Sequence, residues 1–397
     1  MHNVKYLIIG NGIAGLSAAK EIRKNDNQGS IMMISKEPYL PYYRIRLTEF
    51  LSKDFKDEDI LVHKDDWYQK QGIKQLLSKI VERIEIEESM VVLDDGMEIK
   101  YEKLLIATGS RPFIPPIAGK FRQGVLALRT LKDLKYIKNY IDQRTDITII
   151  GGGLLGLEAA WALKKLGKNV NIIELAPYLL PKQLDEEIAN KLEEKLTEQG
   201  FNIYLSSSVE EILGEAMVDG IKLNHNRKIE THVVLFSVGI IPNIDIVRNT
   251  PIEFNRGILV DHGLRTNIEN IYAAGDVIEC HGDILGLWSA SNEQGKVAGA
   301  NMSGQSMKYD KPKPFTMLQI GETKLFSIGN IQNFDSVYEY KNEDKGVHHK
   351  LFISDNRIIG GILFGDVKDM GKLKKAIAGK VTIGSYLEES LPFTKIL

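Results

Sequence analysis

Cysteine is almost absent from this sequence, with a single residue, Cys280, among 397. One cysteine cannot form an internal disulfide, and by itself it cannot anchor an iron–sulfur cluster, which generally takes four thiolates. A lone cysteine is also more often a small hydrophobic residue than a reactive group. Any electron transfer by this chain therefore has to use a bound organic cofactor.

An excess of either charge is also missing, because 51 lysines and arginines stand against 53 aspartates and glutamates. We therefore expect neither nucleic acid nor an anionic membrane surface as a partner. Residues Met1 to Gly10 lack the pattern of a signal peptide, and the longest apolar runs, such as Val233 to Ile241, are too short to span a bilayer. We expect a cytoplasmic globular protein.

The sequence contains one unit twice. The segment from Lys5 to Lys24, KYLIIGNGIAGLSAAKEIRK, recurs in outline from Asp146 to Lys165, DITIIGGGLLGLEAAWALKK. Each copy is typical of a buried strand, a glycine-rich turn and a helix, and a second strand follows, at Ile31 to Ser35 and at Val170 to Leu175. The repeat predicts an α/β fold with two Rossmann-like dinucleotide-binding domains.

Proline-rich segments mark where the chain passes between domains. RPFIPPI, from Arg111 to Ile117, is typical of a crossing linker, IIPN of the return, and YDKPKPF of the start of a C-terminal piece. The strands and the final lysine-rich helix after it predict a small α+β domain. The predicted domains are residues 1–112 with 243–308, residues 113–242, and residues 309–397.

The two glycine motifs carry the strongest functional signal. In Gly10-x-Gly12-x-x-Gly15, the first glycine permits a tight turn, the second lets backbone approach a pyrophosphate, and the third lets helix and strand pack closely. A purely structural turn would have to explain the same spacing twice. The residues predicted to line the loops are Gly10, Gly12, Ile13, Ala14 and Gly15 in the first copy and Gly151, Gly153, Leu154, Leu155 and Gly156 in the second.

The residue that ends the second strand of each unit selects the coenzyme. A carboxylate there accepts the ribose hydroxyls of an adenosine, whereas an arginine suits a 2′-phosphate. In the second domain Glu174 holds this place, and no basic residue follows until Lys182, so NADH is predicted over NADPH. In the first domain Glu37 is the ribose candidate, with Lys36 beside it, and a solvated surface carboxylate is the alternative for Glu37.

Two further short strands end in glycine, one in Ala107-Thr108-Gly109 and the other in Gly275-Asp276. With the two glycine motifs, they resemble the ATG and GD segments of the glutathione-reductase-like flavoproteins, which have two dinucleotide-binding domains. The resemblance implies that the first domain binds FAD, with Asp276 holding its ribityl chain, and that the second binds NADH.

The helix expected from Gly286 to Gly304 follows the GD segment. If its N-terminus points at the pyrimidine edge of the flavin, its dipole favours negative charge there. Trp288, at the start of this helix, either packs as an ordinary aromatic residue or contacts the flavin, and both readings stay open. Asn292 and Gln294 have no predicted role.

Members of this family that reduce disulfides or peroxides need a cysteine beside the flavin, and the corresponding segment, from Tyr39 to Leu51, has none. The segments PYYRIRLTEFL and HKLFISDNRIIGGILFGD look most like NADH-dependent rubredoxin reductases and the N-terminal half of assimilatory nitrite reductase large subunits. The latter carry further cysteine-rich domains, so a free-standing rubredoxin reductase is the expectation.

The same resemblance assigns single residues. It places Arg44 near the flavin and Glu158 just after the second glycine motif, in the flavin and nicotinamide environment. Ferredoxin-reductase relatives pair that glutamate with a lysine, but this chain has Glu49 there, so the partner of Glu158 stays open between Arg44 and Arg46. Val81, Arg129 and Trp288 are assigned to FAD, and Gly239 and Ile240 to the border of the nicotinamide site. An ordinary helix-start ion pair is the alternative for Arg129.

These features predict that NADH reduces the flavin directly and that the flavin passes electrons singly to a small acidic carrier such as rubredoxin. An NADH oxidase or diaphorase, or a slow redox-sensing flavoprotein, is the alternative. We predict no metal, and either a monomer or a homodimer. The candidate docking lysines are Lys372, Lys374, Lys375 and Lys380 in the C-terminal domain and Lys308, Lys311 and Lys313 before it, although such runs are usually solvated faces.

Overall fold

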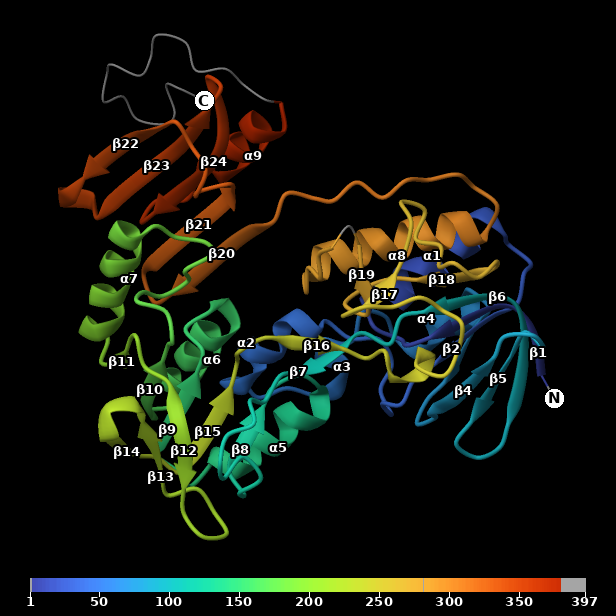
Figure 1. The fold of residues 1–397 in the computed structure, drawn as a ribbon, viewed down its shortest axis with the longest axis horizontal. Helices are drawn as coiled ribbons and strands as arrows, with labels where there is room; N and C mark the ends of the chain where they lie inside the picture. Colours follow the sequence, from blue (N-terminus) through green and yellow to red (C-terminus); the bar gives the residue numbers. More distant parts are fainter. Residues whose placement is uncertain (1, 281, 380–397) are drawn as a thin grey trace. The chain divides into compact units, whose positions relative to one another are not determined.

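The computed structural model describes residues 2–280 and 282–379, and contacts divide the chain into two compact units (Figure 1). The first unit comprises the chain up to Leu47, Asp54–Phe113 and Gly239–Pro312. The second comprises Thr48–Lys53, Ile114–Val238 and the chain from Lys313 on. The C-terminal region therefore groups with the second dinucleotide-binding region, and the predicted three-domain division stays a prediction.

The first unit is built on a sheet with the strand order β3-β2-β1-β6-β5-β4, in which β18 also pairs with β6. Strands β1, β2, β3, β6 and β18 are parallel, and β4 and β5 form an antiparallel edge. The sheet strands are β1 (His2–Ile9), β2 (Ile31–Ile34), β3 (Ile73–Leu76), β4 (Val81–Glu85), β5 (Met90–Leu93), β6 (Glu98–Ile106) and β18 (Ile271–Ala273). The other elements are α1 (Ile13–Asn25), η1 (Arg44–Arg46), α3 (Asp57–Ile60), α4 (Asp65–Lys70), β7 (Ser110–Pro112), β16 (Ile240–Pro242), η3 (Asp245–Val247), β17 (Ile258–Leu259), β19 (Ile278–Glu279) and α8 (Trp288–Met302).

Helices α1 and α8 lie side by side on this sheet because both offer small residues at their contact (Figure 1). A Cβ added at Gly295 would lie 2.2 Å from the carbonyl oxygen of Ala14, and one at Gly299 would lie 2.4 Å from that of Ala18. No larger side chain fits at either place. The α1–α8 pair therefore fixes the helix that follows the GD segment against the first glycine motif.

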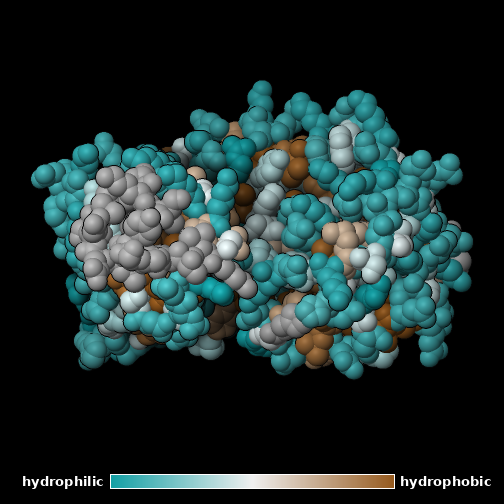
Figure 2. Space-filling model, turned by 90° about the horizontal axis from the view of Figure 1, so that it is seen from above, coloured by the Kyte–Doolittle hydropathy of each residue, from teal (hydrophilic) through white to brown (hydrophobic). Residues whose placement is uncertain are grey.

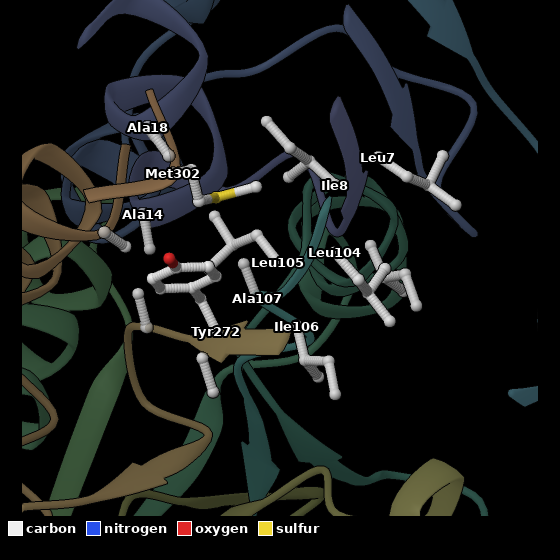
Figure 3. Close-up of a cluster of buried hydrophobic side chains, with 14 of the residues drawn as sticks. Leu7, Ile8, Ala14, Ala18, Leu104, Leu105, Ile106, Ala107, Tyr272 and Met302 are labelled. Carbon is white, nitrogen blue, oxygen red and sulfur yellow. The ribbon is translucent and has the colours of Figure 1, made fainter. Parts of the chain in front are cut away.

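The core of the first unit gathers under the same helices. Figure 3 shows Ala14 and Ala18 of α1, Met302 of α8 and Tyr272 of β18 around Leu105 of β6. All five side chains are buried. Strands covered on both faces read as continuous apolar runs, which is why IMMI and LLI can be recognised as parallel strands in the sequence.

The second unit has a parallel sheet of the same kind, with the strand order β11-β10-β9-β15-β8. Its elements are β8 (Val125–Ala127), α5 (Leu131–Ile141), β9 (Asp146–Ile150), α6 (Leu154–Lys165), β10 (Asn169–Ile173), α7 (Glu186–Glu198), β11 (Asn202–Tyr204) and β15 (Val233–Phe236). An antiparallel sheet joins β12 (Val209–Leu213), β13 (Gly220–Leu223) and β14 (Lys228–Glu230), with η2 (Asn224–Asn226) between the last two. The short helix α2 (Leu47–Leu51) contributes Thr48–Leu51 to this unit.

The C-terminal part is an antiparallel sheet with the order β20-β21-β24-β23-β22 and one helix, α9. Its elements are β20 (Phe315–Ile320), β21 (Thr323–Gly329), β22 (Ser336–Asn342), η4 (Glu343–Lys345), β23 (Val347–Ser354), β24 (Arg357–Phe364) and α9 (Met370–Ala378). The buried Lys350 ties this sheet to the start of α7, where its Nζ lies 2.5 Å from Asp185 and 2.6 Å from Glu187. The α+β C-terminal domain and the two Rossmann-like sheets match the predicted fold class.

On the face shown in Figure 2, hydrophilic residues cover most of the surface and hydrophobic residues form smaller groups. Among residues 2–280 and 282–379, no helix has the length and hydropathy needed to cross a membrane.

We predict that Gly299→Val destabilises the first unit. The new side chain would collide with the Ala18 carbonyl, so α1 and α8 would have to separate, at a cost of about 1–3 kcal/mol. Thermal unfolding followed by circular dichroism measures the loss. Gly371→Ala in α9 is the matched control, because a Cβ there meets no atom within 4 Å, and equal losses in the two variants would contradict the packing argument.

Candidate functional site

The first glycine motif joins β1 to α1 and shows three different uses of glycine. Gly10 has a φ of +109°, and a Cβ there would lie 2.1 Å from the Ala107 carbonyl oxygen. A Cβ at Gly15 would lie 2.1 Å from the Gly10 carbonyl oxygen, whereas one at Gly12 would meet no atom within 4 Å. Packing therefore requires Gly10 and Gly15, and Gly12 is left facing the open space that a pyrophosphate needs.

The second motif, between β9 and α6, repeats this geometry. Gly151 has a φ of +114°, and a Cβ added there would lie 2.3 Å from the Ser237 carbonyl oxygen. A Cβ at Gly156 would lie 2.1 Å from the Gly151 carbonyl oxygen, and one at Gly153 would again meet nothing within 4 Å. The second unit thus holds the same kind of cradle as the first.

The helices behind both cradles start without side-chain caps. The N-cap residues Gly12 and Gly153 make no side-chain hydrogen bond, and the first turns of α1 and α6 hold no acidic residue. By contrast, α5 is capped by Thr130 and α7 by Asp185. Uncapped N–H groups at a positive helix end bind anions, so the two cradles fit the pyrophosphates of FAD and NADH.

Glu174 follows β10 and lies at the rim of the second cradle. Its Oε2 accepts a hydrogen bond from the Gly152 N–H at 2.6 Å, and its Oε1 accepts one from the Ala176 N–H at 2.8 Å. The next residue, Leu175, is 73% exposed. The fixed carboxylate retains lone pairs that can accept the ribose hydroxyls of NADH, and Leu175 offers no charge to a 2′-phosphate.

Asp276 of the GD segment is held from two sides. Its Oδ2 accepts a hydrogen bond from the Ser110 hydroxyl at 3.0 Å, and its Oδ1 accepts one from the Ser291 hydroxyl at 3.2 Å. The preceding Gly275 has a φ of +89° and donates its N–H to Gln294 Oε1 at 2.9 Å. This carboxylate is therefore fixed in place and stays partly exposed, which suits the predicted contact with a ribityl chain.

Three of these supporting residues, Ser110, Ser291 and Gln294, were not predicted from the sequence. The spacing of Ser291 and Gln294, three residues apart on α8, places both on one helix face, and this was the available signal. Asn292, also without a predicted role, accepts a hydrogen bond from the Ser17 hydroxyl of α1 at 2.7 Å.

The ATG segment is locked to the returning chain. Thr108 donates its hydroxyl to the Asn243 carbonyl at 2.9 Å, and the Asn243 side chain donates back to the Thr108 carbonyl at 2.9 Å. The Asn243 N–H also donates to the Gly109 carbonyl. The IIPN segment therefore belongs to the same structure as the ATG segment.

Glu37 is not a solvated surface carboxylate. Its Oε1 lies 2.8 Å from the Arg44 guanidinium, and its Oε2 accepts a hydrogen bond from the Tyr42 hydroxyl at 2.8 Å. The side chain is 15% exposed, while the neighbouring Lys36 is exposed. In the structure, Glu37 therefore holds the Arg44 side chain. Its role as a ribose ligand stays a prediction.

The start of α8 leaves polar groups for a ligand. Its N-cap, Leu287, makes no side-chain hydrogen bond, and its first turn holds no acidic residue. Within the described residues, the buried indole N–H of Trp288 has no hydrogen-bond partner, and the ring lies 6.4 Å from that of Tyr43. These features fit the predicted position beside the flavin. Val81, assigned to FAD by resemblance, begins the edge strand β4 and is partly buried.

Thr48 is the partner that the sequence left undecided for Glu158. Its hydroxyl donates to Glu158 Oε2 at 3.1 Å. Glu49, which stands where relatives have lysine, pairs instead with Lys53 at 2.6 Å. Burial raises the pKa of Glu158, and the bond from Thr48 offsets this only in part.

The remaining assigned residues are Arg129, Gly239 and Ile240. Arg129 belongs to the second unit, where its backbone N–H donates to Asp133 at the start of α5. Gly239 and Ile240 begin the return into the first unit, and a Cβ at Gly239 would meet no atom within 4 Å. Gly12, Arg44, Thr108, Asp276 and Trp288 belong to the first unit, and Gly153, Glu158 and Glu174 belong to the second.

The single cysteine is a core residue, as expected. Cys280 is 7% exposed, and burial raises the pKa of its thiol.

One group in the described chain, Glu187, Glu339 and His348, has the spacing of metal ligands, but Lys350 and Lys341 already pair with its carboxylates. These contacts explain the group as an ion-pair network.

Most of the candidate docking lysines have partners in the structure. Lys311 pairs with Asp283, Lys313 donates to the Ile377 carbonyl, and Lys374 lies over the Phe315 ring. Lys372 lies 3.6 Å from Asp369, while Lys308 and Lys375 are exposed. Lys380 lies outside the described residues.

We predict that Glu158→Gln stabilises the protein above neutral pH. Because the folded-state pKa is raised, the ionised carboxylate costs stability above that pKa, and the cost disappears below the unfolded-state value of about 4.3. The variant should therefore melt at a higher temperature than wild type near pH 8, and the gap should close toward pH 4. Exposed Glu88→Gln is the control, and a gap that is independent of pH would contradict the burial argument.

Comparison with known proteins places these sites in a family. Residues 4–295 match the model described as pyridine nucleotide-disulphide oxidoreductase, and residues 314–381 match that of the rubredoxin NAD+ reductase C-terminal domain. The chain is 37% identical over 384 residues to the NADH-rubredoxin oxidoreductase of Clostridium acetobutylicum, covering 95% of each protein. It is 34% identical over 395 residues to the nitrite reductase [NAD(P)H] of Bacillus subtilis, covering 98% of this chain but 49% of that protein, so it spans about half of this relative's length.

A solved structure is similar over almost the whole chain. The crystal structure of NADH:rubredoxin oxidoreductase from Clostridium acetobutylicum superposes with a TM-score of 0.81 at 34% identity, covering 96% of this chain and 97% of that one. These matches confirm the resemblance, the fold class and the cofactor pair, FAD and NADH, that the sequence predicted. The chain belongs to the pyridine nucleotide-disulphide oxidoreductase family.

Proposed function

We propose that this protein oxidises NADH and passes the electrons through FAD to a small, rubredoxin-like carrier protein. The observation that carries the proposal is the pair of open glycine cradles at Gly12 and Gly153. The only cysteine of the sequence, Cys280, is buried and cannot form an internal disulfide. One relative that covers 95% of this chain and 95% of its own length, from Clostridium acetobutylicum, is named for the same reaction.

The residues of the first unit hold FAD. The start of α1 would bind the pyrophosphate and Asp276 would accept ribityl hydroxyls. Glu37 holds the Arg44 guanidinium in place. The uncapped start of α8 favours negative charge on the ring system. When bound, FAD supplies the chemistry, since it accepts two electrons together and releases them one at a time.

The residues of the second unit hold and orient NADH. The start of α6 binds its pyrophosphate, and Glu174 accepts the adenosine ribose hydroxyls. Glu158 and Thr48 form a polar pair whose carboxyl group stays protonated to higher pH than an exposed one. No protein nucleophile is needed, so the protein contributes position and electrostatics.

The direct test is anaerobic addition of NADH to the FAD-loaded protein, followed by a panel of acceptors. We expect rapid bleaching of the flavin and fast reoxidation by rubredoxin. Steady hydrogen peroxide formation in air that added carrier does not alter would support an NADH oxidase instead. A long-lived complex of the NADH-reduced flavoprotein that no acceptor reoxidises would support a redox sensor.

We predict that Glu174→Arg weakens the preference for NADH. The wild-type carboxylate binds the ribose diol and repels a 2′-phosphate, so NADH should have the higher kcat/KM, and the arginine should shift the ratio toward NADPH by about tenfold or more. Kinetics with both coenzymes measure this. Exposed Glu198→Arg on α7 is the control, and a wild type that uses NADPH equally well would overturn the assignment of Glu174.

We predict that an acidic carrier docks through lysines and that its docking responds to salt. The doubly reversed variants K372E/K375E and K308E/K311E test the two sequence clusters separately. If one cluster attracts the carrier, its variant should associate with the carrier more slowly than wild type does and should therefore reduce it more slowly. The difference between the two rates should shrink above about 0.2 M salt. Stopped-flow carrier reduction measures this, with NADH reduction of the flavin as the control. A rate that neither salt nor either variant changes would exclude both clusters.

A further inference from the structure

Helix α2 crosses from one unit to the other within a few residues. Leu47 belongs to the first unit, Thr48–Lys53 groups with the second, and the chain is back in the first unit at Asp54. Such an excursion by six residues needs contacts that hold it in the second unit, and two side chains of that unit, Lys138 and Glu158, supply them.

Lys138, in the last turn of α5, holds the C-terminal end of this segment. Its Nζ lies 3.2 Å from the carbonyl oxygen of Phe50, 3.4 Å from that of Leu51 and 2.5 Å from that of Lys53. The last carbonyls of a helix have no partners within the helix, and a lysine is well suited to satisfy them. One ammonium group therefore closes the end of α2.

One further contact fixes the body of the segment. Thr48 donates its hydroxyl to Glu158 of α6 at 3.1 Å. Phe50 and Leu51 are 4% and 0% exposed. The segment is thus attached both to the helix that starts at the second glycine cradle and to the neighbouring helix α5.

The other end of the same helical stretch belongs to the FAD site. The 3-10 turn Arg44–Arg46 runs into α2 without a break. Arg44 pairs with Glu37 at 2.8 Å, and the adjacent Tyr43 donates its N–H to the Ile60 carbonyl. A short, continuous helical link transmits displacement better than a flexible loop does.

We propose that α2 is a tether through which the NADH-binding unit positions Arg44 at the FAD site, with Lys138 as its positioning residue. The proposal rests on the proposed function, because it requires both cofactors to bind. A coenzyme that shifts α5 or α6 then shifts the link to Arg44, and the two binding equilibria are coupled. Coupling of this kind is reciprocal, so NAD+ must change the affinity for FAD as much as FAD changes that for NAD+.

The first experiment measures this coupling without turnover. Fluorescence titration gives the Kd of the FAD-free protein for FAD with and without saturating NAD+. We expect wild type to show a ratio of about fivefold or more, and Lys138→Met to bring the ratio close to one. Lys138→Arg should retain the coupling, because its guanidinium can still donate to the helix carbonyls. Lys132→Met, an exposed lysine on the same helix, is the matched control and should behave as wild type.

The second experiment separates the tether from the proposed function. With FAD bound, stopped-flow reduction by NADH should have a limiting rate about tenfold lower in Lys138→Met, as expected for a misplaced site, with little change in the NADH concentration at half-saturation. Thr48→Val provides an independent variant if Lys138→Met proves unstable, and it should lower the same rate. A wild type that NADH does not reduce would overturn the proposed function. A wild type that is reduced normally, with no coupling or with unchanged coupling in both variants, would overturn the tether alone.

Discussion

The starts of α1 and α6, which carry no side-chain cap, are the constraint on which the rest of this structure depends. The first N–H groups of a helix have no partner within the helix, and no side chain caps them at the starts of α1 and α6. Gly10 and Gly15, like Gly151 and Gly156, bring strand and helix together so closely that the middle glycine of each motif faces open space. Both sheets and the α1–α8 contact hold these ends in place.

The carboxylates around the cradles are fixed by the protein before any ligand arrives. Glu174 is held by two backbone N–H groups, Asp276 by two serine hydroxyls, and Glu37 by Arg44 and Tyr42. A carboxylate fixed in this way loses little freedom on binding, so more of the interaction energy is available for choosing the ligand. Glu158 differs, because its partner is one hydroxyl and burial keeps its pKa raised.

The sequence has a single, buried cysteine, and this limits the routes by which electrons can leave the protein. With Cys280 in the core, electrons have no route through a disulfide and have to leave from the flavin itself. Within the second unit, buried Lys350 of the C-terminal sheet bridges Asp185 and Glu187 at the start of α7.

The sequence by itself determined the two dinucleotide-binding units and the role expected of Glu174, because each depends on residues a short distance apart along one βαβ unit. The cofactor pair followed from a family resemblance, which also needs the ATG and GD segments. The glycine spacing dictates local backbone geometry, and the residue after the second strand falls beside it in any fold of this kind. Only the tertiary structure decided that Thr48 is the partner of Glu158, that Gln294 supports Gly275, that Glu37 holds Arg44 and that Lys138 closes α2. Thr48 and Glu158 are 110 positions apart. Contacts across such separations are set by how helices pack, and the hydrophobic pattern of a chain records that a face is buried but not which polar group lies opposite it.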